Sequence, residues 1–285
     1  MNLKDFLFSY LESFKIDLDK KKYFKAFRKL FNYPYKFLLD KLRQLFSIKK
    51  NNLDKNSENF ENKSLDDLFI EFNSDKASKF IMNNKKINGH NYSPIYEKYF
   101  EKYKNIKNLN ILEIGSLRGS GTASFYNYFD KPKIFCVDIN PFQIQIYSKN
   151  IRVLYVDTKS KNALLNLRSY LDKNFDIIID DGSHNIRDQI ITMNIFFEKL
   201  KKGGLYVIED SSQYLSSKSL NPDQLNYGSK DILSSVQNKN VEKIKYLSLD
   251  EVNQLRENMG NIFSEKGNYF ENGINISEII FVEKN

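Results

Sequence analysis

From residue 110 onward, short apolar runs alternate with stretches of helical spacing, and this alternation constrains the fold more than any other feature. Alternating β and α units are typical of a mostly parallel sheet with helices on both faces. The sequence therefore predicts an α/β, doubly wound (Rossmann-like), mostly parallel seven-stranded sheet with an N-terminal helical appendage. The expected strands are 110–114, 133–137, 151–156, 176–180, 204–208, one near 243–248, and 277–282. We expect the last of them to be an antiparallel edge strand.

Each of the first five expected strands ends in an acidic residue. These residues are Glu113, Asp138, Asp157, the pair Asp180 and Asp181, and the pair Glu209 and Asp210. The carboxyl ends of parallel strands meet at one edge of a sheet, where α/β folds build their sites, so we expect the carboxylates to gather there. One of only two histidines, His184, follows Asp181 by three positions. Carboxylates beside an imidazole indicate a divalent metal and a base.

A glycine turn follows the first expected strand and precedes a helix that begins near residue 122. Gly115, Gly119 and Gly121 stand in the order G-x-x-x-G-x-G. A dinucleotide-binding fold uses G-x-G-x-x-G with a pyrophosphate at the helix N-terminus, and an acidic crevice would repel phosphates. The pattern therefore disfavours a nicotinamide oxidoreductase. S-adenosylmethionine fits better, because its sulfonium is positive and its ribose hydroxyls are free.

This cofactor gives the acids along the edge separate expected roles. Asp138 is placed to accept hydrogen bonds from the ribose hydroxyls. Asp157 could contact the adenine amino group, and Asp180 the methionyl ammonium or its own loop. Glu113 is expected either to contact the cofactor or to hold a backbone turn. The full predicted cofactor site is Glu113, Gly115, Ser116, Gly119, Gly121, Asp138, Asp157 and Asp180.

The basic charge of the chain lies in its N-terminal segment. Residues 1–50 hold 13 Lys and Arg and 5 Asp and Glu, a net charge of +8, and the whole chain has 44 − 36 = +8. Residues 51–285 are therefore neutral, which opposes nucleic acid as a partner. Apolar residues at helical spacing in residues 1–48, interrupted at Pro34, predict two or three amphipathic helices. The polar stretch 49–63 is expected to be a linker.

These patterns divide the chain into three parts. They are a basic helical segment with its linker (1–58), a helical lid or connector with a polar loop at 83–91 (59–108), and a catalytic domain (109–285). No apolar run approaches the ~20 residues of a membrane span, and no signal peptide is indicated. The single cysteine, Cys136, excludes an internal disulfide. We expect a cytoplasmic protein whose residues 1–48 form a homo-oligomer interface or a peripheral membrane contact.

Two segments carry a resemblance to a known family. Residues 180–184 read Asp-Asp-Gly-Ser-His, and residues 203–210 read Gly-Gly-Leu-Tyr-Val-Ile-Glu-Asp. Residues 109–285 resemble a class I S-adenosylmethionine-dependent methyltransferase. The two segments are similar to those of the metal-dependent sugar O-methyltransferases of macrolide biosynthesis, the mycinamicin VI 2''-O-methyltransferase type. Upstream, Ser74-Asp75-Lys76 and His90-Asn91-Tyr92-Ser93-Pro94-Ile95-Tyr96-Glu97 also resemble that group, so residues 65–285 are covered and residues 1–60 are not.

The resemblance implies that Asp181, Glu209 and Asp210 hold Mg²⁺ and that His184 is the general base. It also implies methyl transfer from S-adenosylmethionine to a sugar hydroxyl. Mn²⁺ takes the same oxygen ligands and is equally compatible. We expect a nucleotide-activated sugar or a surface-polysaccharide precursor as acceptor. The alternatives are a phosphorylated small molecule or another non-sugar acceptor, and a non-catalytic protein that binds S-adenosylmethionine.

Four neighbouring residues have structural interpretations. We expect Ser183 to cap the helix that follows it, since serine is a favoured N-cap. His90 is expected to pack under a lid loop rather than to line the acceptor site. Lys76 and Tyr92 are expected to belong to that lid.

Overall fold

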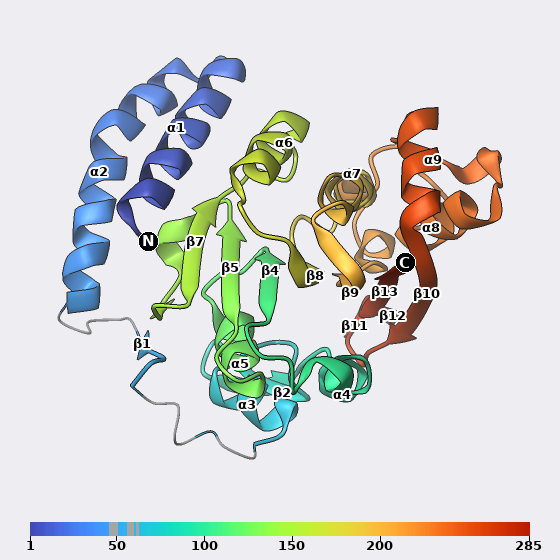
Figure 1. The fold of residues 1–285 in the computed structure, drawn as a ribbon, viewed down its shortest axis with the longest axis horizontal. Helices are drawn as coiled ribbons and strands as arrows, with labels where there is room; N and C mark the ends of the chain where they lie inside the picture. The colour runs from blue at the N-terminus through green and yellow to red at the C-terminus, as the bar shows by residue number, and fades with distance from the viewer. Residues whose placement is uncertain (46–50, 56–59, 61–62) are drawn as a thin grey trace.

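A seven-stranded sheet forms the centre of the computed structural model, which describes residues 1–45, 51–55, 60 and 63–285. Its strand order within these residues is β10-β13-β9-β8-β4-β5-β7 (Figure 1). The parallel strands are β4 (Asn110–Ile114), β5 (Lys133–Asp138), β7 (Ile151–Tyr155), β8 (Phe175–Asp180) and β9 (Leu200–Ile208). β13 (Glu278–Lys284) and β10 (Met259–Lys266) are antiparallel. The predicted doubly wound, mostly parallel sheet is confirmed.

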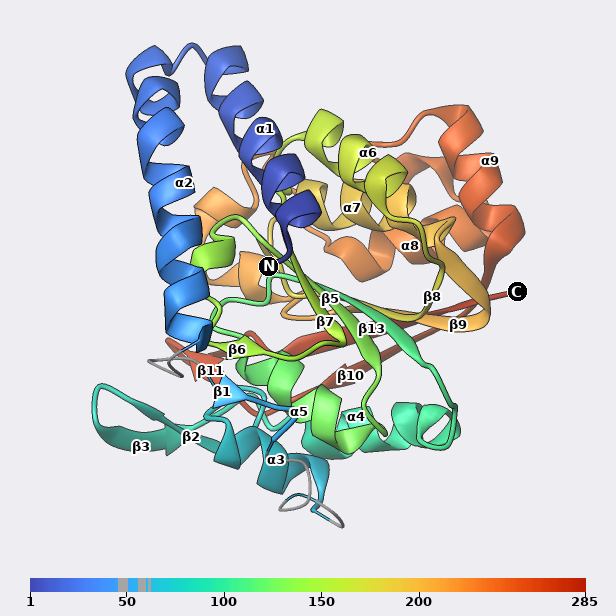
Figure 2. The same ribbon diagram turned by 60° about the vertical axis from the view of Figure 1, so that its left-hand side comes forward.

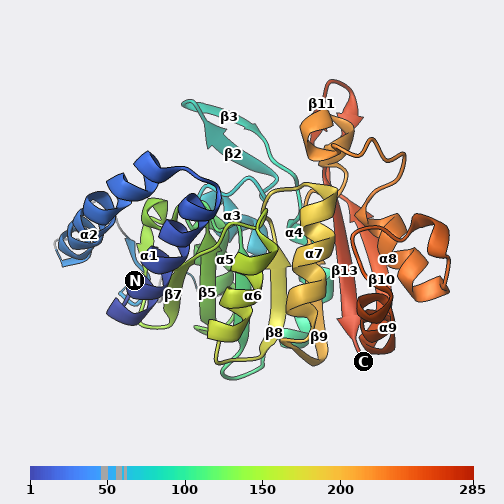
Figure 3. The same cartoon turned by 90° about the horizontal axis from the view of Figure 1, so that it is seen from above.

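Helices cover both faces of this sheet. α6 (Lys161–Tyr170), α7 (Ile186–Phe197), α8 (Ser229–Asn238) and α9 (Leu249–Asn258) lie on one face, and α3 (Leu65–Glu71), α4 (Ser93–Phe100) and α5 (Ser120–Tyr128) on the other (Figure 3). Alternate residues of β4 face opposite sides: Leu112 and Ile114 join the first core and Ile111 the second. Because both faces are buried, the strands are continuous apolar runs.

The expected strand near 243–248 is wrong. The structure has η6 (Val241–Lys243) and an irregular segment at that position. The apolar side chains of Ile244, Tyr246 and Leu247 pack against the core without strand pairing. Ser248 then caps α9 by accepting a hydrogen bond from the Glu251 amide. These three apolar residues resemble a strand in the sequence because they alternate or adjoin as core residues do, although they lie in an irregular segment.

The seventh strand is β10, which the sequence did not indicate because much of its surface is polar and partly exposed. β13 begins one residue after the start of the expected strand 277–282 and is antiparallel, as predicted. It does not lie at the edge, because β10 pairs with its outer side. The expectation of an edge strand there is therefore wrong.

The segment before β4 contains a hairpin where the sequence indicated only a polar loop. β2 (Lys79–Met82) and β3 (Lys85–Asn88) pair across Asn83 and Asn84. Both asparagines have positive φ, 51° and 60°, as a two-residue hairpin turn requires. The expected helices on either side are present as α3 and α4, with η2 (Glu101–Tyr103) following.

The chain begins with a helical hairpin made of α1 (Leu3–Asp19) and α2 (Tyr23–Leu45), which we call the N-terminal hairpin (Figure 2). Pro34 lies inside α2, so the interruption expected there does not end the helix. α1 packs beside β7, the terminal strand of the sheet. Ser9 Oγ accepts a hydrogen bond from the Tyr155 amide at 3.0 Å.

An ion pair also ties α1 to β7. Arg152 on β7 lies 2.7 Å from the fully buried Asp5 on α1. In the described part of the chain, no helix is long and apolar enough to cross a membrane. The expected linker 49–63 lies partly outside the described residues, and within it Asn51–Asn52 form β1, which pairs with β6 (Ile146–Tyr147). The division of the chain at residues 58 and 108 stays a prediction.

Candidate active site

The glycine turn after β4 brings the backbone against the loop after β8. Gly115 has a φ of 92°, and a Cβ at this position would lie 1.8 Å from the carbonyl oxygen of Asp181. Only glycine fits this close approach. Gly119, with a φ of 88°, precedes the first residue of α5, and Gly121 lies against the Glu113 carboxylate. The turn is therefore packed directly beside two of the predicted acids.

Glu113 is buried beneath this turn. Its carboxylate accepts a hydrogen bond from the Thr122 hydroxyl on α5, and its backbone oxygen accepts one from Ser116 at 3.1 Å. Burial raises the pKa of Glu113 to about 7. Its contacts thus fix the start of α5 and the turn, which corresponds to the second of its two expected roles.

Asp138 and Asp157 end neighbouring strands and make different contacts. Asp138 accepts hydrogen bonds from the Leu117 amide at 2.8 Å and the Asn140 amide at 2.7 Å, so it joins the glycine turn to its own loop. Burial raises the pKa of Asp138. Asp157 lies 2.6 Å from the ammonium of Lys20, at the end of α1. Part of its charge is therefore neutralised by the N-terminal hairpin.

Asp180 is buried at the end of β8, where it accepts a hydrogen bond from the Gly182 amide at 3.2 Å. Burial raises its pKa to about 8. The expectation that Ser183 caps α7 is wrong: its hydroxyl donates to Asp188 at 2.7 Å. Asn185 is the N-cap instead, and its side chain accepts from the Arg187 amide, because the loop extends two residues further than expected.

Asp181, His184 and Asp210 come together at the carboxyl edge of the sheet. One potential ligand atom from each lies within 4.8 Å of the others, and His184 Nε2 is 3.8 Å from Asp181 Oδ1. Both His184 and Asp210 have positive φ, 54° and 52°. The predicted base thus lies beside two of the three predicted metal ligands.

The third predicted ligand, Glu209, is bound by Lys76. The ammonium of Lys76 lies 2.7 Å from Glu209 Oε2 and 2.5 Å from Asp181 Oδ2. The other oxygen of Glu209 accepts a hydrogen bond from the Tyr96 hydroxyl. Burial opposes the charge of Lys76, but the carboxylates of Asp181 and Glu209 outweigh it and raise its pKa well above the usual value. Burial raises the pKa of Glu209.

His90 and Tyr92 hold Asp210 from the other side. His90 Nδ1 lies 3.0 Å from Asp210 Oδ1, and the Tyr92 hydroxyl donates to the same oxygen at 2.6 Å. Burial alone would raise the pKa of Asp210, but His90 lowers it well below its usual range. The His90 ring also stacks on Tyr269 at 4.8 Å. His90 therefore packs, as expected, and also contacts the site.

The donor set suits a divalent cation that prefers oxygen ligands. Among the described residues, no hydrogen-bond donor occupies Asp181 Oδ1 or Asp210 Oδ2. These two oxygens and His184 Nε2 are available to a ligand. Glu209 could become a ligand only if it shared its oxygens with Lys76 and Tyr96.

A family model matches the part of the chain that builds this site. The family model described as "Methyltransferase domain" matches residues 105–267, more than half of the chain. The chain belongs to this methyltransferase family. The predicted recognition is thereby confirmed, and the matched range includes the glycine turn, every strand-end acid and His184.

This methyltransferase is also similar to curated O-methyltransferases. Demethylmacrocin O-methyltransferase of Streptomyces fradiae is 29% identical over 128 residues, which cover 42% of this chain and 32% of that protein. Mycinamicin VI 2''-O-methyltransferase of Micromonospora griseorubida is 30% identical over 128 residues, covering 42% and 31%. The methyltransferase therefore matches about a third of the length of these relatives.

The fold of the methyltransferase is similar to that of a solved structure. MycE methyltransferase in complex with Mg, SAH and mycinamycin VI aligns with a TM-score of 0.56 and 20% identity. The alignment covers 79% of this chain and 55% of that one. The similarity extends the fold assignment beyond the family match.

Sequence reasoning assigned no site role to Lys76, Tyr92 or Tyr96 of the methyltransferase. All three are buried and donate to the acids of the site. The available signal was the Ser-Asp-Lys and His-Asn-Tyr motifs in the segment before β4. Their partners lie more than a hundred positions away in the sequence, so no local pattern links them.

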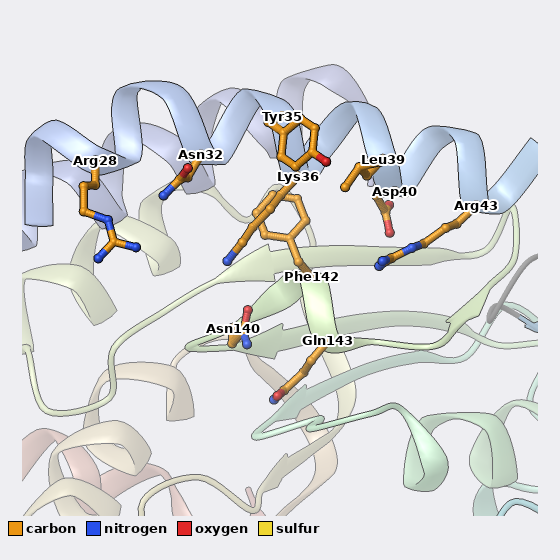
Figure 4. Close-up of a pocket in the computed structure, with 10 residues that line it drawn as sticks. All are labelled: Arg28, Asn32, Tyr35, Lys36, Leu39, Asp40, Arg43, Asn140, Phe142 and Gln143. Atoms are coloured by element: carbon orange, nitrogen blue, oxygen red, sulfur yellow. The ribbon is translucent and has the colours of Figure 1, made fainter.

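A pocket of about 500 Å³ separates α2 of the methyltransferase from the loop after β5. Figure 4 shows Arg28, Lys36 and Arg43 on the side of α2 that faces Asn140 and Gln143. Gln143 donates to Asp138 at 3.2 Å, which joins this pocket to the predicted ribose site. A cationic surface therefore borders the carboxyl edge of the sheet.

Proposed function

We propose that this methyltransferase transfers the methyl group of S-adenosylmethionine to a sugar hydroxyl with the help of a divalent cation. The observation that carries the proposal is the convergence of Asp181, Asp210 and His184 beside the glycine turn. Acids and an imidazole from separate loops at the carboxyl edge are the arrangement expected of a catalytic site in an α/β sheet.

Asp181 and Asp210 would hold the cation through their available oxygens, with Glu209 as the third carboxylate. Mg²⁺ or Mn²⁺ would orient neighbouring hydroxyls of the acceptor and lower their pKa. His90 and Tyr92 keep Asp210 ionised and oriented, which is how residues behind a metal ligand support its geometry. The chain therefore supplies both the ligands and their supports.

His184 would act as the general base. Its Nε2 faces the same space as Asp181 Oδ1, so it could accept the proton of an acceptor hydroxyl held there. A positioned base is typically worth ~10²–10⁴-fold in rate. Asp181 would stabilise the imidazolium that results, since the two groups lie 3.8 Å apart.

The cofactor would lie along the carboxyl edge between the glycine turn and the ends of β5 and β8. Asp138 is oriented by three hydrogen bonds and retains lone pairs for the ribose hydroxyls. Gly115 and Gly119 let the turn pack against Asp181 and Ile146, which fixes the position of this side of the edge. Asp157 remains proposed as a contact of the adenine amino group, next to Lys20, and Asp180 as a contact of the methionyl ammonium.

A nucleotide-activated sugar or a surface-polysaccharide precursor is the proposed acceptor. The names of the curated relatives support a glycosylated acceptor, since two are 2- or 3-position O-methyltransferases of rhamnosyl tetracenomycin. The cationic pocket supports a phosphorylated one, because Arg28, Lys36 and Arg43 border the same edge as the acids. A phosphorylated molecule without a sugar is the second candidate on that ground.

Conversion of S-adenosylmethionine to S-adenosylhomocysteine should be measured against a panel of nucleotide sugars and non-sugar phosphates. Reactions with Mg²⁺, with chelator and with His184→Asn protein complete the design. Turnover on sugars that chelator and the substitution abolish would support the proposal. Turnover in chelator would reject the metal, turnover only on non-sugars would reject the acceptor, and cofactor binding without turnover would indicate a non-catalytic protein.

A further inference from the structure

The N-terminal hairpin carries an exposed apolar surface, which we call the apolar face. Its residues are Leu3, Leu7, Leu11 and Leu18 of α1, and Phe24, Phe27, Phe31, Leu38, Leu42 and Leu45 of α2, with side chains between 39% and 76% exposed. Successive members are three, four or seven positions apart, so each set forms one stripe along its helix. Exposed surfaces of this kind mark sites of interaction.

An amphipathic helix usually turns its apolar side toward the body of the protein. In α2 the basic side faces the body instead, and most large apolar side chains are exposed. Its basic side, with Arg28, Lys36 and Arg43, faces the body of the protein across the pocket in Figure 4. Its buried residues within the described chain are Ala26, Tyr33 and Asp40. The phenylalanine and leucine stripe lies on the side away from the pocket. Among the residues that the structure describes, the larger apolar side of α2 therefore stays exposed.

The charges around the apolar face are mostly positive. Residues 3–45 contain eleven Lys and Arg and five acids. Three of the acids, Asp5, Asp17 and Asp40, are buried. Asp5 pairs inward with Arg152, and Asp17 pairs with Lys29 at 2.7 Å. These three acids are turned into the fold. Asp19 is exposed, as are Lys21, Lys22 and Lys41, so cations outnumber acids on the outer surface of the hairpin.

We propose that the N-terminal hairpin docks this surface on an anionic lipid bilayer. An amphipathic helix with phenylalanine and leucine on one side and Lys and Arg on the other lies in the plane of the headgroups, with its apolar side buried. Anionic headgroups attract the flanking cations. This inference concerns a surface distinct from the acid cluster and does not depend on the proposed reaction.

A second copy of the chain would cover the apolar face less favourably. A symmetric dimer places the same patch of each protomer against the other. Here that would bring together the exposed lysines of two hairpins, including Lys21, Lys22 and Lys41, and like charges at an interface oppose association. The charge pattern therefore favours an anionic bilayer over self-association.

Co-sedimentation of the full chain with vesicles tests the proposal. We expect binding to phosphatidylcholine vesicles that contain phosphatidylglycerol, little binding to phosphatidylcholine alone, and weaker binding at high salt. Phe27→Ser/Phe31→Ser should weaken binding about tenfold or more, because these two exposed rings contact each other in the apolar face. Ile106→Ser/Leu249→Ser, which changes exposed apolar residues outside the hairpin, should bind as the wild type does.

Lys21→Gln/Lys22→Gln should reduce binding to the anionic vesicles at low salt. The reduction should be smaller at high salt, where the charges are screened. Circular dichroism confirms that each variant is folded. Failure to bind either vesicle would overturn the proposal, as would equal binding by all variants. A dimer in light scattering that Phe27→Ser/Phe31→Ser dissociates, without vesicle binding, would assign the apolar face to self-association instead.

Discussion

Lys76 Nζ lies 2.7 Å from Glu209 Oε2, although 133 positions separate the two residues in the sequence. Lys76 also contacts Asp181, so one buried ammonium pairs with two carboxylates that follow neighbouring strands. Like charges gathered at a buried site would otherwise oppose folding. The segment before β4 thus completes the electrostatics of the site built by the sheet.

Lys76→Met keeps an unbranched side chain that ends one atom short of the ammonium, and it removes this charge. Because the buried Glu209 and the partly exposed Asp181 would lose the cation that pairs with both, we expect a loss of about 3 kcal/mol in the free energy of unfolding without metal. Added Mg²⁺ or Mn²⁺ should stabilise the variant more than the wild type, since the cation replaces the lost charge. Urea unfolding with and without metal measures both effects. Lys79→Met, at an exposed position on β2, is the control, and equal losses in the two variants would contradict the expectation.

His184→Asn tests the proposed base. We expect kcat to fall ~10²–10⁴-fold, because the proton of the acceptor would lose its receiver. Binding of S-adenosylmethionine, measured by calorimetry, should be nearly unchanged, since His184 lies at the acid cluster. A variant that loses cofactor binding as well as kcat would show that His184 has a structural role.

Glu113 predicts a pH dependence of stability. Its pKa rises from an unfolded value of 4.5 to about 7 because it is buried. The folded state therefore favours the protonated carboxyl, and its stabilisation is complete below pH 4.5 and is lost as the pH rises through 7. Relative to Glu113→Gln, the wild type should lose about 3 kcal/mol across this range. Guanidinium unfolding of both proteins at several pH values measures the difference, and parallel curves would argue against it.

Alanine substitutions at two glycines with positive φ distinguish the cost of backbone strain from the cost of a steric clash. Gly115→Ala should cost more than about 4 kcal/mol, because its Cβ would collide with the Asp181 carbonyl oxygen. Gly203 has a φ of 70° and no atom near its absent Cβ, so Gly203→Ala should cost only ~1 kcal/mol of strain. Thermal unfolding compares them. Similar melting temperatures would mean that the turn after β4 can move away from Asp181.

The sheet could be predicted because its strands are encoded locally. A strand buried on both faces, such as β8, is a short apolar run, and its terminal acids stand out from it. This was enough to locate Asp181, His184 and Asp210. β10 could not be found in the same way, because an edge strand with exposed polar residues resembles a loop.

Contacts between distant segments were beyond local pattern. Lys76 and His90 belong to a segment whose own sequence indicates only helices and turns. Their role in the site is evident only once the fold places them beside Asp181 and Asp210. The orientation of α2 also could not be predicted from the sequence, because helical periodicity identifies an apolar stripe without identifying what packs against it.

The hydrogen bond from the Tyr155 amide to Ser9 has a consequence for the outermost strand. Among the described residues, β7 has a strand neighbour on one side only. An unpaired strand edge is a template for the addition of strands from other molecules. α1 occupies the space beside that edge and satisfies one of its free amides. We expect that a variant without α1 and α2 would associate through the exposed edge of β7. The first helix therefore protects the protein from aggregation.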